Sequence, residues 1–166
     1  VTGVQRGLCR SEQQDRAHWD TDAIAEGIDR LDAALRRGQP GPYQVQAAIA
    51  ACHASARDAA ATDWVEIATL YGELVRMVPT PVVELNRAVA VGMAFGPEAG
   101  LELANRLISE PALEKYHLLP SVRADLLKKL GRLKEAQAEF ERAAAMTRNV
   151  RERALLLDRA RSCTAN

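Results

Sequence analysis

Apolar positions recur with helical spacing along almost the whole chain. Between Ile24 and Leu35 the isoleucines and leucines are separated by four, three and four residues, so they fall on one face of a helix. Gly38 and Pro40 follow and supply a stop signal. The pattern therefore predicts an amphipathic helix over about residues 21–37.

Prolines and capping residues divide the rest of the chain into further helices. Thr80 can cap a helix with Pro81 in its first position, where the missing N–H costs nothing, and Asp63 with Glu66 forms a capping pair. Beta-branched runs bounded by turns are absent. Besides 21–37, the segments predicted as helices are 42–59, 63–78, 81–94, 97–108, a helix that ends at Gly131, 132–146 and 150–161.

Only a few residues connect consecutive helices, which favours antiparallel neighbours. The predicted fold class is therefore all-α, with stacked antiparallel helical hairpins. Residues 1–14 lack periodicity and are predicted to form an irregular lead-in. Residues 15–166 are predicted to form a single helical-hairpin domain, a normal length for one hydrophobic core.

Small and aromatic residues near the end of the chain match the tetratricopeptide pattern, a repeat of two helices. Ala136, Phe140 and Ala143 follow Ala124 by 12, 16 and 19 residues, in the small–small–aromatic–small order of that repeat. A second partial match precedes it by 56 residues, which is not a multiple of the usual repeat of about 34. An irregular, tetratricopeptide-like stack follows. The residues predicted to pack its repeats are Trp64, Ala68, Ala124, Gly131, Ala136, Phe140 and Ala143.

The charge balance and the cysteines limit the classes of partner and the cellular compartment that the sequence predicts. Lys plus Arg and Asp plus Glu both total 22, so no bulk charge favours nucleic acid or an anionic membrane. Residues 41–122 carry a net −4 and residues 123–166 a net +5; the arginines of this basic end alternate with acids, which is typical of a solvated helix face. The three cysteines are an odd number and lie far apart, which predicts a reducing, cytoplasmic setting. The apolar runs are far shorter than the about 20 residues that a membrane span needs, so none is predicted.

The sequence shows no residue pattern typical of a catalytic or metal-binding site. Cys52 and His53 are adjacent, so on a helix they point about 100° apart and do not form a catalytic dyad. His18, His53 and His117 lack partners at metal-ligand spacing. The glycines form no phosphate-binding loop. We therefore expect no enzyme activity, no cofactor and no metal.

Asn86 and Arg87 interrupt the apolar series between Val82 and Val91 and are expected to be partly buried there. They either clamp the helix to the loops around Pro79 or Gly96, or they contact an extended partner segment in a concave groove. Gly72 and Gly92 inside helices indicate close packing of a neighbouring helix or a backbone-lined groove. The candidate partner-binding groove residues are Tyr43, Gln46, Tyr71, Asn86, Arg87, Tyr116, His117 and Arg123.

Four blocks of the chain resemble the carboxy-terminal extension of a subgroup of extracytoplasmic-function RNA polymerase sigma factors. The blocks are 41–54 (GPYQVQAAIAACHA), 62–64 (TDW) with Ile67-Ala68 and Leu70-Tyr71, 79–91 (PTPVVELNRAVAV) with Gly96-Pro97, and 116–119 (YHLL) with 123–127 (RADLL) and Gly131-Arg132. Gln14-Asp15-Arg16 with Trp19-Asp20 resembles the preceding segment. The resemblance covers about residues 12–160.

The resemblance implies a tetratricopeptide-like domain that supports or modulates transcription initiation through protein contacts. In that family the extension follows two sigma modules. The first binds core polymerase and melts the promoter, and the second, a helix-turn-helix module, recognises the promoter sequence. Neither module is recognisable in these residues, so no direct DNA binding is expected. The implied partners are the sigma modules in cis, or polymerase or a regulatory protein in trans. The alternative is a free-standing tetratricopeptide-like sensor of peptides or small molecules.

Overall fold

The computed structural model describes residues 20–36, 40–56, 58 and 60–164. The predicted lead-in at 1–14, Cys9 and His18 lie outside these residues. The described residues contain α-helices, one short 3-10 helix and no strand, so the predicted all-α fold class is confirmed. The helices are α1 (Thr21–Leu35), α2 (Pro42–Ser55), α3 (Trp64–Met77), α4 (Pro81–Ala94), α5 (Pro97–Arg106), the 3-10 helix η3 (Pro111–Leu113), α6 (Leu118–Lys129), α7 (Leu133–Met146) and α8 (Val150–Arg161).

Helix boundaries agree with the predicted ones to within a few residues, because local signals set them. The Thr80 hydroxyl accepts a hydrogen bond from the Val83 N–H at 3.3 Å, and Pro81 begins α4. Gly131 ends α6 with a φ of 73°, a conformation that glycine adopts without strain. There the Arg132 N–H donates to the Leu127 carbonyl at 3.0 Å. The second helix is shorter than predicted and ends at Ser55.

The chain divides into two compact units, with the boundary between Asp63 and Trp64. The sequence predicts a single domain over residues 15–166; in the structure α1 and α2 belong to unit 1, and α3 to α8 belong to unit 2. In unit 1, α1 and α2 pack against each other. The Gly41 N–H donates to Gln44 Oε1 at 3.1 Å at the start of α2, and Val45 and Ile49 are its buried residues.

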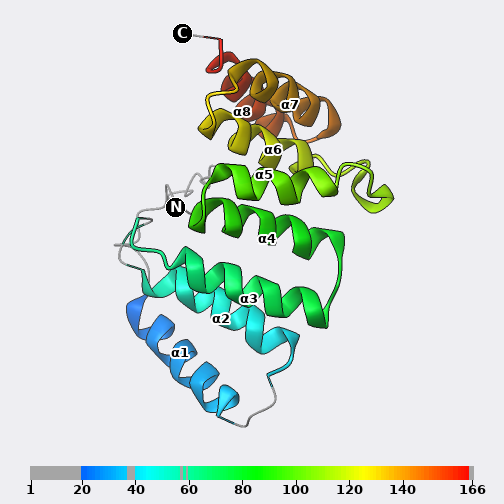
Figure 1. Cartoon of the computed structure of the whole chain (residues 1–166). Helices are drawn as coiled ribbons and strands as arrows, with labels where there is room; N and C mark the ends of the chain where they lie inside the picture. The colour runs from blue at the N-terminus through cyan, green and yellow to red at the C-terminus, as the bar shows by residue number, and fades with distance from the viewer. Residues whose placement is uncertain (1–19, 37–39, 57, 59, 165–166) are drawn as a thin grey trace. The chain divides into compact units, whose positions relative to one another are not determined.

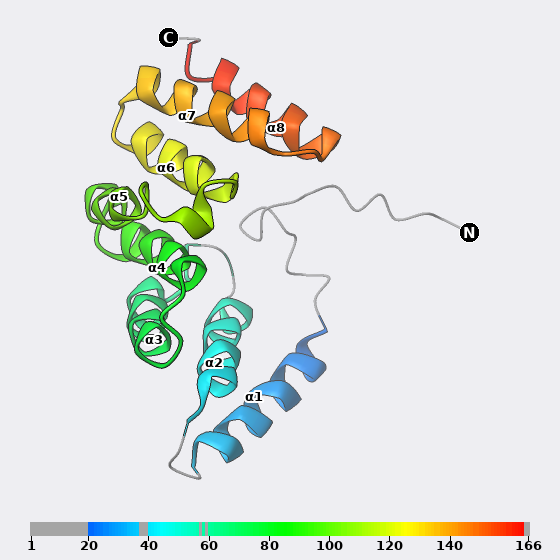
Figure 2. The same cartoon turned by 90° about the vertical axis from the view of Figure 1, so that its right-hand side faces the viewer.

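In unit 2 each helix packs against the next one along the chain, and α4 also contacts α6. Figure 1 shows α3, α4 and α5 as successive layers, and Figure 2 shows α6, α7 and α8 following them. This is the stacked arrangement of helical hairpins that short connections predict. None of the described helices is both long and apolar enough to cross a bilayer.

The main core of unit 2 joins five helices. Phe140 is fully buried at its centre, and burying such a side chain stabilises a fold by about 1.5–3 kcal/mol. The core includes the four residues of the tetratricopeptide-like match, which are each 0% exposed. The buried members are Ala88 from α4, Leu101 and Ala104 from α5, Ala124, Leu126 and Leu127 from α6, Ala136, Phe140, Ala143 and Ala144 from α7, and Leu156, Ala160 and Cys163 near α8.

Helices α4 and α5 approach each other at two glycines. A Cβ added at Gly100 would lie 2.7 Å from the Ala88 carbonyl oxygen and 2.7 Å from the Gly92 Cα. One added at Gly92 would lie 2.6 Å from a methyl carbon of Leu126. Close packing, one of the two interpretations of Gly92, accounts for this glycine. It does not account for Gly72, because an added Cβ there meets nothing within 4 Å.

Candidate partner-binding site

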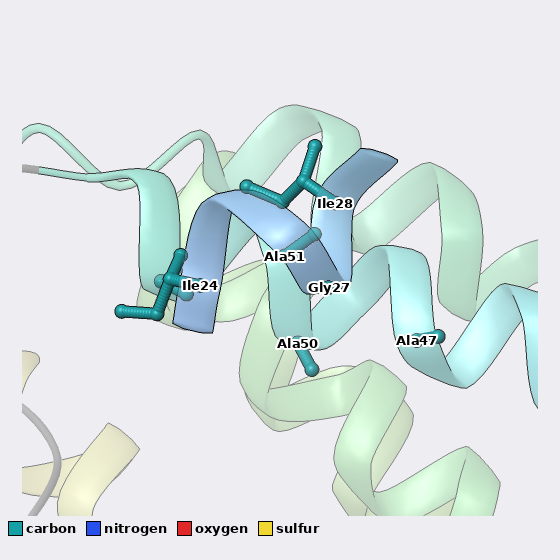
Figure 3. A pocket seen from close by; sticks show the side chains of 7 residues that line it. Ile24, Gly27, Ile28, Ala47, Ala50 and Ala51 are labelled. Atoms are coloured by element: carbon teal, nitrogen blue, oxygen red, sulfur yellow. The ribbon is translucent and has the colours of Figure 1, made fainter. Parts of the chain in front are cut away.

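An apolar groove runs between α1 and α2 in unit 1, with a volume of about 240 Å³. Figure 3 shows Ile24 and Ile28 on α1 facing the groove beside the small residues of α2. Tyr43 lies one turn before Ala47 on the same face of α2 and is 82% exposed. The groove is lined by Ile24, Gly27, Ile28, Ala47, Ala50, Ala51 and Ala54.

The lining of this groove is apolar, and five of its seven side chains are glycine or alanine. Small side chains let another backbone approach closely, and an uncharged lining favours an apolar partner segment over an ionic one. Of the predicted groove residues, Tyr43 and Gln46 lie one turn before the lining residues Ala47 and Ala50, and both are exposed. The helical spacing of Ala47, Ala50 and Ala54 was the sequence signal for this groove, and the sequence prediction overlooked it.

Arg123 of α6 is largely buried and joins three helices of unit 2. Its Nε donates to the Asn105 Oδ1 of α5 at 3.0 Å, and its Nη1 donates to the Glu139 carboxylate of α7. The Arg123 and Glu139 side chains are 15% and 16% exposed. Such charge-assisted bonds between helices fix their packing. Arg123, predicted as a groove residue, therefore bonds within the stack, and its partners Asn105 and Glu139 were not predicted.

His117 directly precedes α6 and bonds to α8. Its Nε2 lies 2.9 Å from Glu152 Oε1, while the Thr147 hydroxyl donates to the other carboxylate oxygen. The hydrogen bond from Thr147, and then that from His117, lower the pKa of Glu152 below its usual value. His117 is thus held by a residue 35 positions later in the chain, a pairing that sequence spacing alone does not reveal.

The Glu152 carboxylate makes the stability of unit 2 dependent on pH. Because its pKa is lowered on folding, its contribution is present above the unfolded value of about 4.5 and is lost as pH falls through the folded value. We expect the free energy of unfolding of the wild type to fall more steeply on acidification below about pH 4.5 than that of Glu152→Gln. Urea unfolding between about pH 3 and 7 measures this; parallel curves for the two proteins would contradict it.

The tyrosines among the predicted groove residues have separate environments. Tyr71 of α3 is half-buried, and burial raises the pKa of its hydroxyl. Tyr116 packs against a small second core formed by Leu85, Leu113 and Leu119. Its ring centroid lies 6.1 Å from that of His117. Tyr116 and His117 are therefore neighbours in unit 2, whereas the described contacts do not bring Tyr71 to them.

The prediction that Asn86 is partly buried is wrong. Leu85 and Ala88 turn into the core, and Asn86 lies with Val82 on the exposed sector of α4. Arg87 is half-buried, and among the residues that the structure describes its Nη1 bonds only to Glu84 of the same helix, at 3.5 Å. Neither residue therefore clamps α4 to the loops at Pro79 or Gly96, and both remain available as surface contacts.

Replacing Arg87 by alanine is expected to change stability little. The Arg87–Glu84 pair joins positions i and i+3 of one helix, with side chains 35% and 33% exposed, and such pairs contribute about 0.2–0.5 kcal/mol. Chemical denaturation of Arg87→Ala measures the change. A loss of more than about 1 kcal/mol would mean that Arg87 holds the fold together.

The cysteines and histidines in the described part of the chain lie on α2, directly before α6 and beside α8. Cys52 and His53 are both half-buried on α2. Cys163 is buried beside α8, where its thiol lies 3.4 Å from the Arg159 carbonyl oxygen. Within the ranges that the structure describes, no group of three or more His, Cys, Asp or Glu side chains is placed to hold a metal ion.

Comparison with known proteins gives one relative in sequence and one in structure. The chain is 47% identical over 145 residues to an uncharacterized protein of Rhizobium meliloti (strain 1021); the match covers 87% of this chain and 34% of that protein. The chain thus spans about a third of the length of the curated relative. No family model matches. The fold is similar to that of the first TPR domain of Spaghetti (RPAP3), solved with an HSP90 peptide, with a TM-score of 0.52 and 17% identity over 90% of this chain and 98% of that one.

Proposed function

We propose that this chain is a non-catalytic interaction domain of an extracytoplasmic-function RNA polymerase sigma factor, acting in the cytoplasm on transcription initiation. Its partners are the sigma modules of the same protein, or polymerase or a regulatory protein in trans. The domain itself does not bind promoter DNA. The observation that carries the proposal is the ordered series of four sequence blocks on a tetratricopeptide-like stack of hairpins.

The length of the Rhizobium relative supports this proposal. The matched segment is about a third of that protein, so the remaining two thirds offer room for two sigma modules. The balance of acidic and basic residues in this chain also favours protein contacts over direct contacts with a nucleic acid. Both points fit a domain that acts on neighbouring modules rather than on DNA.

Transcription by the Rhizobium relative tests the proposal. The complete protein and a version without the segment matched by this chain are each added to core polymerase on a promoter that the complete protein uses. A change in the amount of transcript that is reversed by adding this chain separately supports a regulatory interaction domain. Failure of the complete protein to direct any promoter-specific transcription contradicts the sigma-factor context.

The second candidate function is a free-standing receptor for peptides or small molecules. It is favoured by the apolar groove between α1 and α2 and by the similar solved domain, which was bound to a peptide. In this case the bound segment lies along Tyr43 and the alanines of α2. Ala50→Glu, which places a charge in that groove, would abolish binding of such a ligand while leaving sigma contacts made by unit 2 intact.

A further inference from the structure

The last helix of unit 2, α8, leaves an apolar stripe uncovered. Leu156 and Ala160 face the core, whereas Val150, Ala154 and Leu157 lie on another face at positions i, i+4 and i+7. Val150 is 79% exposed and Leu157 is 38% exposed. This spacing is the same as that of the apolar faces by which helices pack on each other.

The stripe borders a groove between α7 and α8. The groove has a volume of about 310 Å³ and is lined by Glu141, Ala144, Ala145, Arg153 and Leu157. Arg153 forms one wall, fixed by hydrogen bonds from its guanidinium to the carbonyl oxygens of Ala144 at 3.2 Å and Thr147 at 2.9 Å. Ala144 and Ala145 have small side chains, so a helix can approach α7 closely there.

The stacking order of unit 2 indicates what fits this groove. Each helix of unit 2 packs against the next one along the chain. A further helix beside α8 would pack against α8 in the same way, and the groove between α8 and α7 offers a place for it. The groove therefore has room for one more helix, with Ala144, Ala145 and Leu157 as its apolar lining and Glu141 and Arg153 as its charged lining.

The charges around the stripe specify the chemistry of that helix. Arg148 and Arg151 flank Val150 and are exposed, and neither forms an ion pair within the part of the chain that the structure describes. Residues 147–164 carry a net +3. Arg161 lies one turn beyond Leu157 and, within the described ranges, pairs only with Asp158, at 3.2 Å. An acidic partner complements this surface, whereas a basic one is repelled.

We propose that the groove between α7 and α8 binds an amphipathic helix of a partner protein, with an apolar face against Val150, Ala154 and Leu157 and acidic side chains against Arg148 and Arg151. The inference rests on the proposed interaction role, but it does not depend on the sigma-factor context. It also changes the interpretation of the basic end of the chain, which the sequence alone assigned to a solvated helix face.

Fluorescence anisotropy with a designed peptide tests this inference. The probe is a labelled helical peptide of about 18 residues, five turns long, with leucine and alanine on one face and glutamate on the other. The matched control carries lysine at every glutamate position. We expect the complete chain to bind the glutamate peptide, to bind the lysine peptide at least about tenfold more weakly, and to lose affinity when salt rises from about 50 to about 300 mM.

Variants of the chain then locate the binding. Arg148→Glu with Arg151→Glu should weaken binding of the glutamate peptide about tenfold, and Val150→Asp should weaken it without any change to an arginine. Because Val150 is exposed in the first turn of α8, an acidic residue there is compatible with the helix. Arg36→Glu, an equal charge change at an exposed position of unit 1, should leave binding unchanged.

Three results would overturn the inference: no binding of the glutamate peptide, equal binding of the two peptides, or equal effects of the unit 1 and α8 charge reversals. These results would not touch the sigma-factor proposal, because transcription by the Rhizobium relative tests that separately. Circular dichroism of each variant checks that its helices are intact.

Discussion

Replacing Phe140 by alanine is expected to lower the free energy of unfolding by about 3–5 kcal/mol. The Phe140 side chain is 0% exposed and lies in the core shared by five helices of unit 2. The Arg159 guanidinium carbon lies 4.3 Å from the centre of its ring, and Arg159 also pairs with Asp125 of α6. Truncation therefore leaves a cavity and removes the ring beneath a largely buried cation. Urea unfolding followed by circular dichroism measures the loss.

Phe95→Ala is the matched control for this prediction. Phe95 follows α4 and is 62% exposed, so removing the same atoms there should change the free energy of unfolding by no more than about 0.5 kcal/mol. Losses of similar size for the two phenylalanines would show that the helices of unit 2 are not packed around Phe140 as described.

Replacing Gly100 by alanine is expected to destabilise unit 2 by about 1–3 kcal/mol, even though alanine favours helices. The three atoms nearest to the added Cβ are backbone atoms of α4, at 2.7, 2.7 and 2.9 Å. Backbone atoms cannot rotate away as a side chain can, so α4 and α5 must separate. Thermal and urea unfolding of Gly100→Ala measure the cost.

Gly72→Ala makes the opposite prediction for the same substitution. The position lies inside α3 and an added Cβ meets nothing within 4 Å. Alanine should therefore raise the free energy of unfolding by up to about 1 kcal/mol, through its higher helix propensity. A gain at Gly72 with a loss at Gly100 supports the close crossing of α4 and α5. A gain at both positions would contradict it.

Local signals made most of the fold predictable. Thr80 and Pro81 mark the start of α4, and Gly131, which adopts a positive φ, marks the end of α6. The spacing of Ala136, Phe140 and Ala143 predicted a shared packing face, and the structure places all three in one core. The division at Asp63 was not predicted, because the second helix was predicted to reach residue 59, close to the start of the third, whereas α2 ends at Ser55 and α3 begins at Trp64.

The candidate site was less predictable, since it depends on contacts between residues distant in sequence. His117 with Glu152, and Arg123 with Asn105 and Glu139, join different helices and give no local pattern. Asn86 was misplaced because an apolar series around a polar residue does not say which sector of the helix remains open. The groove residues of α2 were overlooked because alanine is typical of any helix. Whether these alanines line an open groove depends on how much of α2 is covered by α1.

Direct binding tests the central claim, that these hairpins form an interaction domain for the transcription machinery. This chain would be titrated by isothermal calorimetry against core RNA polymerase and against the separately prepared sigma modules of the Rhizobium relative. The account predicts saturable binding to at least one of them with a Kd below about 10 µM, and no binding to promoter DNA alone. Absence of binding to both proteins at high micromolar concentration, with the chain folded, would contradict it.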